Sequence, residues 1–309
     1  MTGTTSGGTD TRNGALPDRA ARRAAIAAGV VGRGRELDLV LAAVSAGRDV
    51  LLEGPPGTGK STLLRAITKN WGVPFVLVEG NAELTASRLV GHHDPARVLR
   101  EGYTAENFVP GPLVAAMEQG GFLYIEEFNR APEDTINVLL AAMAEREVVV
   151  PRFRTVAAAP TFRVVASMNP FDAVGTARIS ESVYDRWCRL VVGFQDAAEE
   201  EAIVAARTGC TDAGLVQDAV AITRASRSHR ELRRGASVRG AIDLTAVAVE
   251  LAAMDDGREL RDRVLDAAML ALSARIFLDE ASERTPEDVI RDLWEAHYFP
   301  PPGRDRARS

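Results

Sequence analysis

Apolar residues along the first two-thirds of this chain form short runs of strand length, separated by stretches with a helical period. Runs that stay apolar, rather than alternating with polar residues, are typical of parallel strands buried on both faces of a sheet. The pattern therefore predicts a parallel sheet whose strands alternate with helices. Strands are expected at 49–53, 74–79, 121–127, 162–168 and 189–194, and helices at 20–28, 36–46, from about 60 onward, 112–119, 131–145 and 179–187.

Two stretches interrupt this alternation. Residues 80–111 carry no sustained period, so we expect an irregular insertion there with one short helix near 84–89. Residues 148–165 predict two β segments around a turn, at 148–150 and 162–165. The second segment continues through a buried strand that ends at Met168.

After residue 195 the pattern predicts helices only. Parallel β/α units followed by a helical run indicate an α/β core, with five parallel strands flanked by helices, and a small all-α lid domain. Helical periods recur near 197–208, 213–228, 236–253, 260–280 and 285–297. The expected division is a disordered tail at 1–19, the α/β core at 20–195, the helical lid at 196–299 and a flexible tail at 300–309.

Composition excludes several classes of protein. No apolar run approaches the roughly 20 residues needed to span a bilayer, and the N-terminus lacks the apolar segment of a signal peptide. Cys188 and Cys210 show no metal-ligand spacing and suggest a reducing compartment, so we expect a cytoplasmic protein. The net charge of −6 argues against a dedicated nucleic-acid-binding protein. A local basic patch at Arg152 and Arg154 is left open.

The first candidate site follows the strand at 49–53. A strand, a glycine-rich loop and the start of a helix are the context of a phosphate-binding P-loop, whose backbone N–H groups turn toward phosphate oxygens. Lys60 can reach the β- and γ-phosphates of ATP, and the Ser61 hydroxyl can ligate Mg²⁺. Among 37 basic residues only Lys60 and Lys69 are lysines, which favours a specific need for a lysine here. The expected binding residues are Gly54, Pro55, Pro56, Gly57, Thr58, Gly59, Lys60, Ser61 and Thr62.

The second candidate site is the acidic pair Glu126-Glu127 at the end of an apolar run. In open α/β folds, ligands bind at the carboxyl ends of the strands, where this pair is expected. Glu126 is assigned to the Mg²⁺ shell, together with Ser61. Glu127 is assigned to orienting and polarising the attacking water. The alternative is a strand that simply ends in solvated charge.

Three weaker signals accompany these motifs. Asn169, where the strand ending at Met168 stops before Pro170, can hydrogen-bond the attacking water or the γ-phosphate, although an Asn-Pro pair alone is more often a turn. Val30-Val31 before the first long helix can form the slot for the purine base, with Val31 as the contact residue, although such an apolar pair is more often part of the core. His92-His93 lacks further ligands in sequence, so an ordinary loop is favoured over a metal site.

In this order the motifs resemble an AAA+ ATPase, within it the MoxR family, and they are similar to magnesium-chelatase ATPase subunits. The resemblance covers roughly residues 30–297. It is carried by the P-loop, Pro110-Gly111-Pro112-Leu113, Glu127-Phe128-Asn129-Arg130-Ala131-Pro132, Met168-Asn169-Pro170, Asp185-Arg186-Trp187 and Gly235-Ala236-Ser237-Val238-Arg239.

The resemblance implies further roles. Asn169 would be the sensor-1 residue and Arg239 the sensor-2 arginine of the lid. Arg186 would be the finger that reaches the γ-phosphate bound to a neighbouring subunit. An intramolecular ion pair is the alternative for Arg186, and a solvated surface charge is the alternative for Arg239. Residues 80–111 would be the helix-2 insertion and residues 148–162 the pre-sensor hairpin.

The resemblance also implies a homo-oligomeric ring, usually a hexamer, that hydrolyses ATP with Mg²⁺ and acts like a chaperone. Its partner would be a protein with a von Willebrand factor A domain, and its client an enzyme complex that is matured or receives a metal. The alternatives are a magnesium-chelatase-type motor, an ATP-binding switch with little turnover, and a DNA-linked ATPase, which the net charge disfavours. One departure stands out: Glu126 replaces the usual aspartate, which puts the turnover rate in doubt.

Overall fold

The computed structural model of this chain describes residues 19–170, 181–254 and 257–300. The two tails expected at the ends, and part of the helix expected at 179–187, lie outside these residues. Within the described ranges, no helix is both long enough and apolar enough to cross a membrane.

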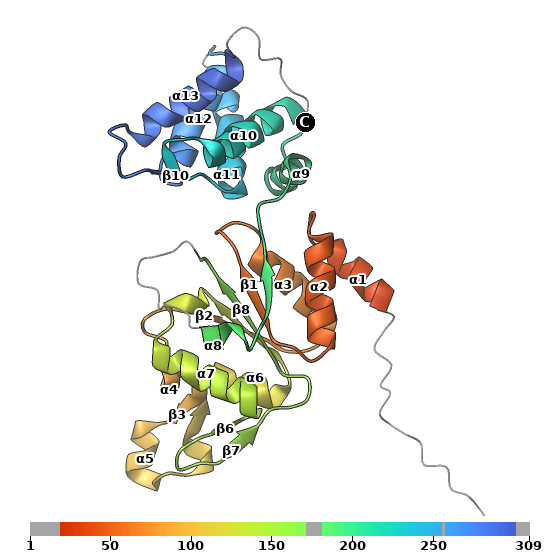
Figure 1. The fold of residues 1–309 in the computed structure, drawn as a ribbon, viewed down its shortest axis with the longest axis vertical. Helices are drawn as coiled ribbons and strands as arrows, with labels where there is room; N and C mark the ends of the chain where they lie inside the picture. Colours follow the sequence, from red (N-terminus) through yellow and green to blue (C-terminus); the bar gives the residue numbers. More distant parts are fainter. Residues whose placement is uncertain (1–18, 171–180, 255–256, 301–309) are drawn as a thin grey trace, which may run out of the picture.

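Five parallel strands form the central sheet, in the order β2-β5-β8-β1-β9 (Figure 1). This confirms the predicted α/β fold class. Because β8 lies between β1 and β5, its carboxyl end meets the P-loop on one side and the acidic pair on the other. The strands are β1 (Val50–Glu53), β2 (Phe75–Glu79), β5 (Phe122–Glu126), β8 (Arg163–Met168) and β9 (Cys188–Val191).

Alternate side chains of the central strands enter two different apolar clusters, one on each face of the sheet. Leu51 and Leu123 belong to one cluster, and Leu52 and Tyr124 belong to the other. Both faces of the sheet are therefore shielded from water, which explains why these strands are apolar throughout. One face is covered by α1 (Arg19–Ala27), α2 (Gly34–Ser45) and α3 (Lys60–Trp71), and the other by α4 (Ala86–Val90), α6 (Pro112–Gln119), α7 (Glu133–Glu145) and α8 (Glu181–Tyr184).

The insertion at 80–111 is more regular than expected. Its two antiparallel strands, β3 (Gly91–His93) and β4 (Phe108–Pro110), enclose α5 (Pro95–Glu101) and a 3₁₀ turn, η1 (Ala105–Asn107). This hairpin was not predicted from the sequence because each strand has only three residues, too few to show a period. His93 packs edge-on against the rings of Tyr103 and Phe108, and the described residues contain no group of three or more His, Cys, Asp and Glu side chains that could hold a metal.

The segment at 148–165 requires a correction. β6 (Glu147–Val149) pairs with β7 (Thr155–Ala157), whereas the predicted partner at 162–165 belongs to β8 in the central sheet. A strand at 155–157 was not expected, since Thr155-Val156-Ala157 is too short to show a period. Its central residue, Val156, is fully buried, which fixes the hairpin against the core.

The expected absence of strands after residue 195 is wrong. β10 (Leu232–Arg234) pairs antiparallel with β11 (Phe277–Leu278), and this short ribbon ends the helix predicted at 260–280 early. The remaining elements are helices, and we call residues 196–299 the helical region. They are α9 (Ala197–Thr208), α10 (Ala213–Ala225), the 3₁₀ turn η3 (Ser226–Ser228), α11 (Val238–Ala253), α12 (Leu260–Leu272) and α13 (Pro286–Tyr298).

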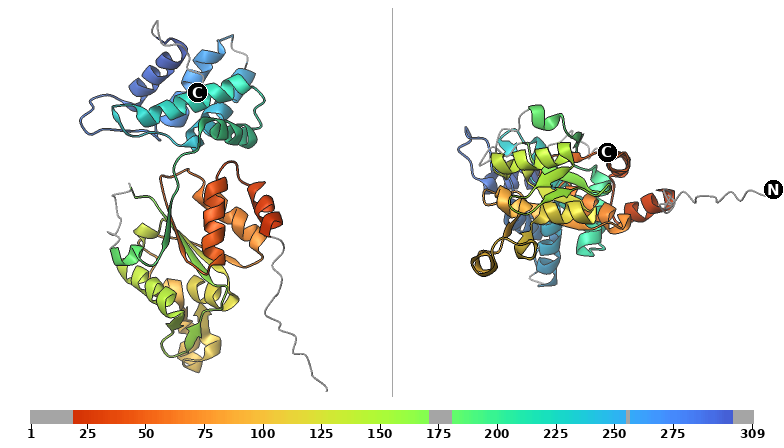
Figure 2. Two further views of the ribbon diagram at one scale, coloured as in Figure 1. Left: turned by 45° about the vertical axis from the view of Figure 1, so that its right-hand side comes forward. Right: turned by 90° about the horizontal axis from the view of Figure 1, so that it is seen from below.

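The helical region lies beyond the sheet and joins it through the residues between β9 and α9 (Figures 1 and 2). It has an apolar core of its own, in which Leu244 and Leu272 are fully buried. The link is held by hydrogen bonds: Gln195 Nε2 donates to the carbonyl of Val31 at 2.5 Å, and Arg224 donates to the carbonyl of Gln195 at 2.8 Å. The helical region is thus attached near the start of α2 and the P-loop.

Candidate active site

The P-loop is a tight turn between β1 and α3. Gly57 and Gly59 have positive φ values of 78° and 80°, in the region that favours glycine. A Cβ on Gly57 would also collide with the hydroxyl of Ser237 in the helical region. The loop therefore requires glycine at position 57 both for its own backbone and for the close approach of the helical region.

Lys60 points into this loop. Its ammonium donates to the carbonyl oxygens of Gly54 and Pro55, each at 2.8 Å. Burial lowers the pKa of Lys60 to about 8; the nearby Glu126 carboxylate opposes this shift, and the Arg239 and Arg33 guanidinium groups add to it. The ammonium also donates to the Thr58 hydroxyl at 3.4 Å, so it is held at the end of the loop by neutral oxygen atoms, among other positive charges.

Ser61, at the start of α3, and Glu126, at the end of β5, meet at the carboxyl edge of the sheet. The Ser61 hydroxyl donates to the Glu126 carboxylate, and it lies 3.3 Å from the Tyr124 hydroxyl. Tyr124 in turn lies 2.8 Å from the Ser167 hydroxyl, and burial raises the pKa of Tyr124. An adjacent hydroxyl and carboxylate are the oxygen donors that Mg²⁺ takes from proteins when phosphates and water complete its shell, so these residues fit the ion.

Glu127 adopts an unusual backbone conformation. Its φ of 52° places a non-glycine residue in the left-handed region, where the chain turns from β5 into a 3₁₀ turn, η2 (Phe128–Arg130). A Cβ on Gly80 would collide with the Glu127 carbonyl, so the neighbouring strand end approaches closely. The Glu127 carboxylate forms an ion pair with Arg130 at 2.8 Å.

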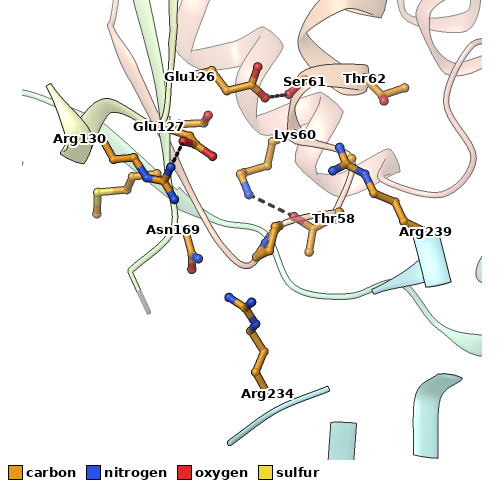
Figure 3. Close-up of a pocket in the computed structure, with 15 residues that line it drawn as sticks. Thr58, Lys60, Ser61, Thr62, Glu126, Glu127, Arg130, Asn169, Arg234 and Arg239 are labelled. Carbon is orange, nitrogen blue, oxygen red and sulfur yellow. Dashed lines mark hydrogen bonds and ion pairs between the residues drawn. The ribbon is translucent and has the colours of Figure 1, made fainter. Parts of the chain in front are cut away.

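These residues line one cleft of about 320 Å³, within the size range of small-molecule sites (Figure 3). Asn169 reaches it from the end of β8, and the Asn169 carbonyl accepts a hydrogen bond from Asn129 at 3.3 Å. Arg234 and Arg239 reach it from the helical region. The full lining is Pro56, Gly57, Thr58, Gly59, Lys60, Ser61, Thr62, Glu126, Glu127, Arg130, Ser167, Met168, Asn169, Arg234 and Arg239.

Three expected binding residues do not line this cleft. Gly54 is buried behind the loop, where a Cβ would collide with the Val192 carbonyl, and Pro55 lines an adjacent pocket with Arg234 and Arg239. Val31, assigned to the purine base, is 37% exposed and lies outside the lining. Its carbonyl instead ties α2 to the link before the helical region.

Arg186 lies elsewhere in the molecule. It lines a second cleft of about 710 Å³ with Arg48, Asp49, Arg146 and Arg163, at the amino ends of β1, β8 and β9. The P-loop and the acidic pair lie at the opposite edge of the same sheet. Arg186 is therefore not brought together with Lys60 within one chain.

Three arginines in or beside the main cleft escaped the sequence reasoning. Arg33 is buried and donates to the carbonyl of Thr58 in the P-loop at 2.9 Å. Arg130 pairs with Glu127, and Arg234 enters from β10. In a chain with so many arginines, none of them carried a distinguishing signal. Arg130 lies inside the Glu127–Pro132 motif, which was its one available clue.

Comparison with known proteins covers the part of the chain that carries this site. The family described as AAA domain (dynein-related subfamily) matches residues 49–187, which include the P-loop, both acids and Arg186. The chain is 26% identical over 286 residues to the gas vesicle ATPase GvpN of Ancylobacter aquaticus, covering 86% of this chain and 79% of that protein. It is 29% identical over 268 residues to GvpN2 of Halobacterium salinarum, covering 82% and 74%.

Solved structures share the fold. A protein described as a putative ATPase from Cytophaga hutchinsonii superimposes with a TM-score of 0.51 at 22% identity, over 89% of this chain and 92% of that one. The RuvB Holliday junction branch migration motor of Thermotoga maritima gives 0.52 at 18% identity, over 78% and 70%. With the P-loop, the acidic pair and the helical region in these positions, the matched AAA domain and the relatives named as gas vesicle ATPases support an AAA+ ATPase of the MoxR type.

Proposed function

We propose that copies of this chain assemble into a ring, a hexamer as the family resemblance implies, and couple Mg²⁺-dependent ATP hydrolysis to the remodelling of a partner protein complex. The observation that carries the proposal is the single cleft that gathers the P-loop, both acids, Asn169 and two arginines of the helical region. Groups that bind phosphate, hold a metal and activate water are therefore adjacent, as nucleoside triphosphate hydrolysis requires.

The chain's own groups divide the work of phosphate binding. Lys60 and Arg239 are positioned to bind phosphate oxygens, and Ser61 and Glu126 to hold Mg²⁺. The ion, when bound, neutralises negative charge on the phosphoryl group. Glu126 is one methylene longer than the aspartate usual in this family, so we expect metal binding to survive and turnover to be slower.

Glu127 is proposed to take a proton from the attacking water, which Asn169 orients. In this structure Glu127 is paired with Arg130, and both side chains are about two-fifths exposed, at 42% and 40%. An ion pair this exposed contributes about 0.2–1 kcal/mol, so releasing Glu127 costs little. Rearrangement of this pair is part of the proposed catalytic cycle.

Arg186 is proposed to act on the nucleotide of a neighbouring subunit. The position of Arg186 at the sheet edge opposite its own P-loop supports this role, because only a second copy can bring it to an occupied cleft. In P-loop enzymes an arginine supplied in trans is worth about 10³–10⁵ in rate. A single subunit is then expected to be almost inactive.

The client is proposed from the relatives. Two relatives that match more than four-fifths of this chain carry the name gas vesicle ATPase, which favours a role connected with gas vesicles. A partner with a von Willebrand factor A domain, maturation of or metal insertion into a client enzyme complex, and a cytoplasmic location stay predictions from the sequence. The same holds for the division between core and lid at residue 195.

An ATP-binding switch with little turnover is the second candidate. Two observations favour it: a glutamate, Glu126, and not an aspartate accepts a hydrogen bond from the Ser61 hydroxyl, and the Glu127 carboxylate is paired with Arg130. Such a protein would bind ATP tightly and release phosphate very slowly. The helical region would then respond to occupancy rather than to hydrolysis.

Phosphate release measured against protein concentration tests the proposal, using Mg-ATP with the unmodified chain, Glu127→Gln and Arg186→Ala. We expect specific activity to rise with concentration, and each variant to lose at least about 10²-fold because it lacks the base or the trans arginine. Negligible activity at all concentrations, despite ATP binding, would contradict the proposal and leave the ATP-binding switch as the remaining candidate. Activity that is independent of concentration and intact in Arg186→Ala would exclude the trans arginine.

A further inference from the structure

We propose that Arg234 binds the terminal phosphate of the nucleotide, as a second phosphate-binding arginine of the helical region beside Arg239. This inference rests on the proposed ATPase function and adds a residue that distinguishes ATP from ADP. Arg234 lines the cleft together with Lys60 and Asn169.

The β-ribbon of the helical region holds Arg234 in place. Arg234 is the last residue of β10 and lies opposite Phe277 of β11, with its guanidinium carbon 3.8 Å from the centre of the Phe277 ring. Stacking on an aromatic face fixes the planar guanidinium and leaves its edge N–H donors for a ligand. Arg234 is half-buried, so part of the conformational freedom of its side chain is lost before a ligand arrives.

The charge around Arg234 favours an anion. Among the residues that the structure describes, Arg234 and Arg239 have no carboxylate partner, and Lys60 donates only to neutral groups of the loop. The two carboxylates of the cleft are engaged, Glu127 by Arg130 and Glu126 by Ser61. Lys60, Arg234 and Arg239 therefore have no carboxylate partner among the described residues, and a ligand with several negative charges would neutralise them.

Arg234 and Arg239 approach the P-loop from different sides. In Figure 3, Arg234 extends toward the loop on the side of Asn169, whereas Arg239 lies on the side of Thr62. Asn169 stands beside Glu127, where the attacking water and the terminal phosphate are proposed to meet. Arg234 is accordingly assigned to the terminal phosphate rather than to the α-phosphate or the base.

Such a contact would link the helical region to the state of the nucleotide. ATP would be held by Arg234 and ADP would not, so only ATP would draw the β10–β11 ribbon toward the P-loop. A ligand shifts a conformational equilibrium only as far as it binds the two conformations differently, and Arg234 supplies that difference between ATP and ADP.

Calorimetric titration with Mg-AMP-PNP and Mg-ADP tests the assignment on the full chain. In Arg234→Ala, we expect AMP-PNP affinity to fall about tenfold, as for the loss of a hydrogen bond to a charged group, with ADP affinity changed less than about threefold. Arg234→Lys, which keeps the charge but not the planar stack, should be intermediate. Phe277→Leu should weaken AMP-PNP binding in the same selective way.

Arg233→Ala is the matched control. Arg233 is the preceding residue of the same strand, points to solvent and pairs with Glu280 at 3.4 Å, so both affinities should stay unchanged. Equal losses for AMP-PNP and ADP in Arg234→Ala, or the same loss in Arg233→Ala, would overturn the assignment. If the unmodified chain bound neither nucleotide, the proposed function would fall as well, whereas an unchanged affinity ratio in Arg234→Ala would remove this inference alone.

Discussion

Lys60 shows how the fold adjusts the chemistry of one residue. The ammonium is partly buried beside Arg239 and Arg33, and its pKa lies near 8 instead of above 10. Phosphate groups placed against this ammonium would favour its charged form and raise the pKa again. Nucleotide binding and protonation of Lys60 are therefore expected to be linked.

The sign of this linkage gives a prediction. Because the pKa is higher in the bound state than the value of about 8 in the free state, binding takes up a proton above pH 8. Affinity for Mg-AMP-PNP should be nearly constant from pH 6.5 to 7.5 and then fall, approaching tenfold per pH unit above pH 8. Calorimetry from pH 6.5 to 9.5 in buffers of different ionisation enthalpy measures both the affinity and the proton uptake.

Lys69→Met is the control, since Lys69 is the only other lysine in the chain. It lies on α3, away from the cleft lining, and the pH dependence should persist in this variant. An affinity that stays constant up to pH 9.5 would contradict the linkage.

At the scale of elements, the buried carboxylate of Glu200 stabilises the packing of α9 and α10 against the residues between β9 and α9. Glu200 is 1% exposed and pairs with Arg227 at 2.8 Å and with Arg224 at 3.4 Å. Arg227 also stacks over Phe194, and burial lowers the pKa of Arg227 while Glu200 opposes that shift. The Glu200 carboxylate thus offsets the cost of burying the positive charge of Arg227.

We expect Glu200→Ala to lower the free energy of unfolding by about 3–5 kcal/mol, because it leaves Arg227 buried without its counter-charge. Urea denaturation followed by circular dichroism measures the change. Glu201→Ala, at the next and less buried position, should change it by less than about 0.5 kcal/mol. The double variant Glu200→Ala, Arg227→Ala should lose less than the sum of the single losses. Simple additivity would show that the pair is not coupled.

At the scale of the whole molecule, the two arginine-containing clefts lie at opposite edges of the sheet. One contains the P-loop and Glu127, and the other contains Arg186. An arrangement in which each site needs a group from the far edge of another copy is heterologous, and such contacts generate rings when the rotation closes. Complementation between inactive variants should therefore be possible.

Mixing Glu127→Gln with Arg186→Ala should restore hydrolysis. A subunit with intact Glu127 next to a subunit with intact Arg186 makes a complete site, and random mixing of equal amounts places about a quarter of the sites in that arrangement. Phosphate release from the mixture, after exchange of subunits, measures the recovery. Each variant mixed with itself is the control, and a mixture no more active than these controls would argue against a shared site.

The sequence predicted much of this architecture because the relevant signals are local. Apolar runs located the five strands, and Gly54–Ser61, Glu126 and Glu127 were recognised from neighbours within the chain. The short ribbons were missed: β10–β11 and β6–β7 have strands of two or three residues, too few to establish a period. Their pairing depends on contacts between residues distant in sequence.

The sequence by itself determined the fold class and the phosphate-binding loop, since hydrophobic periodicity and glycine conformations act over a few residues. The tertiary structure decided which side chains share the cleft. The strand order puts Asn169 between Lys60 and Glu127, brings Arg234 in from the helical region and leaves Val31 and Arg186 outside. Such distances follow from the crossovers of the sheet and the docking of the helical region, and no local pattern encodes them.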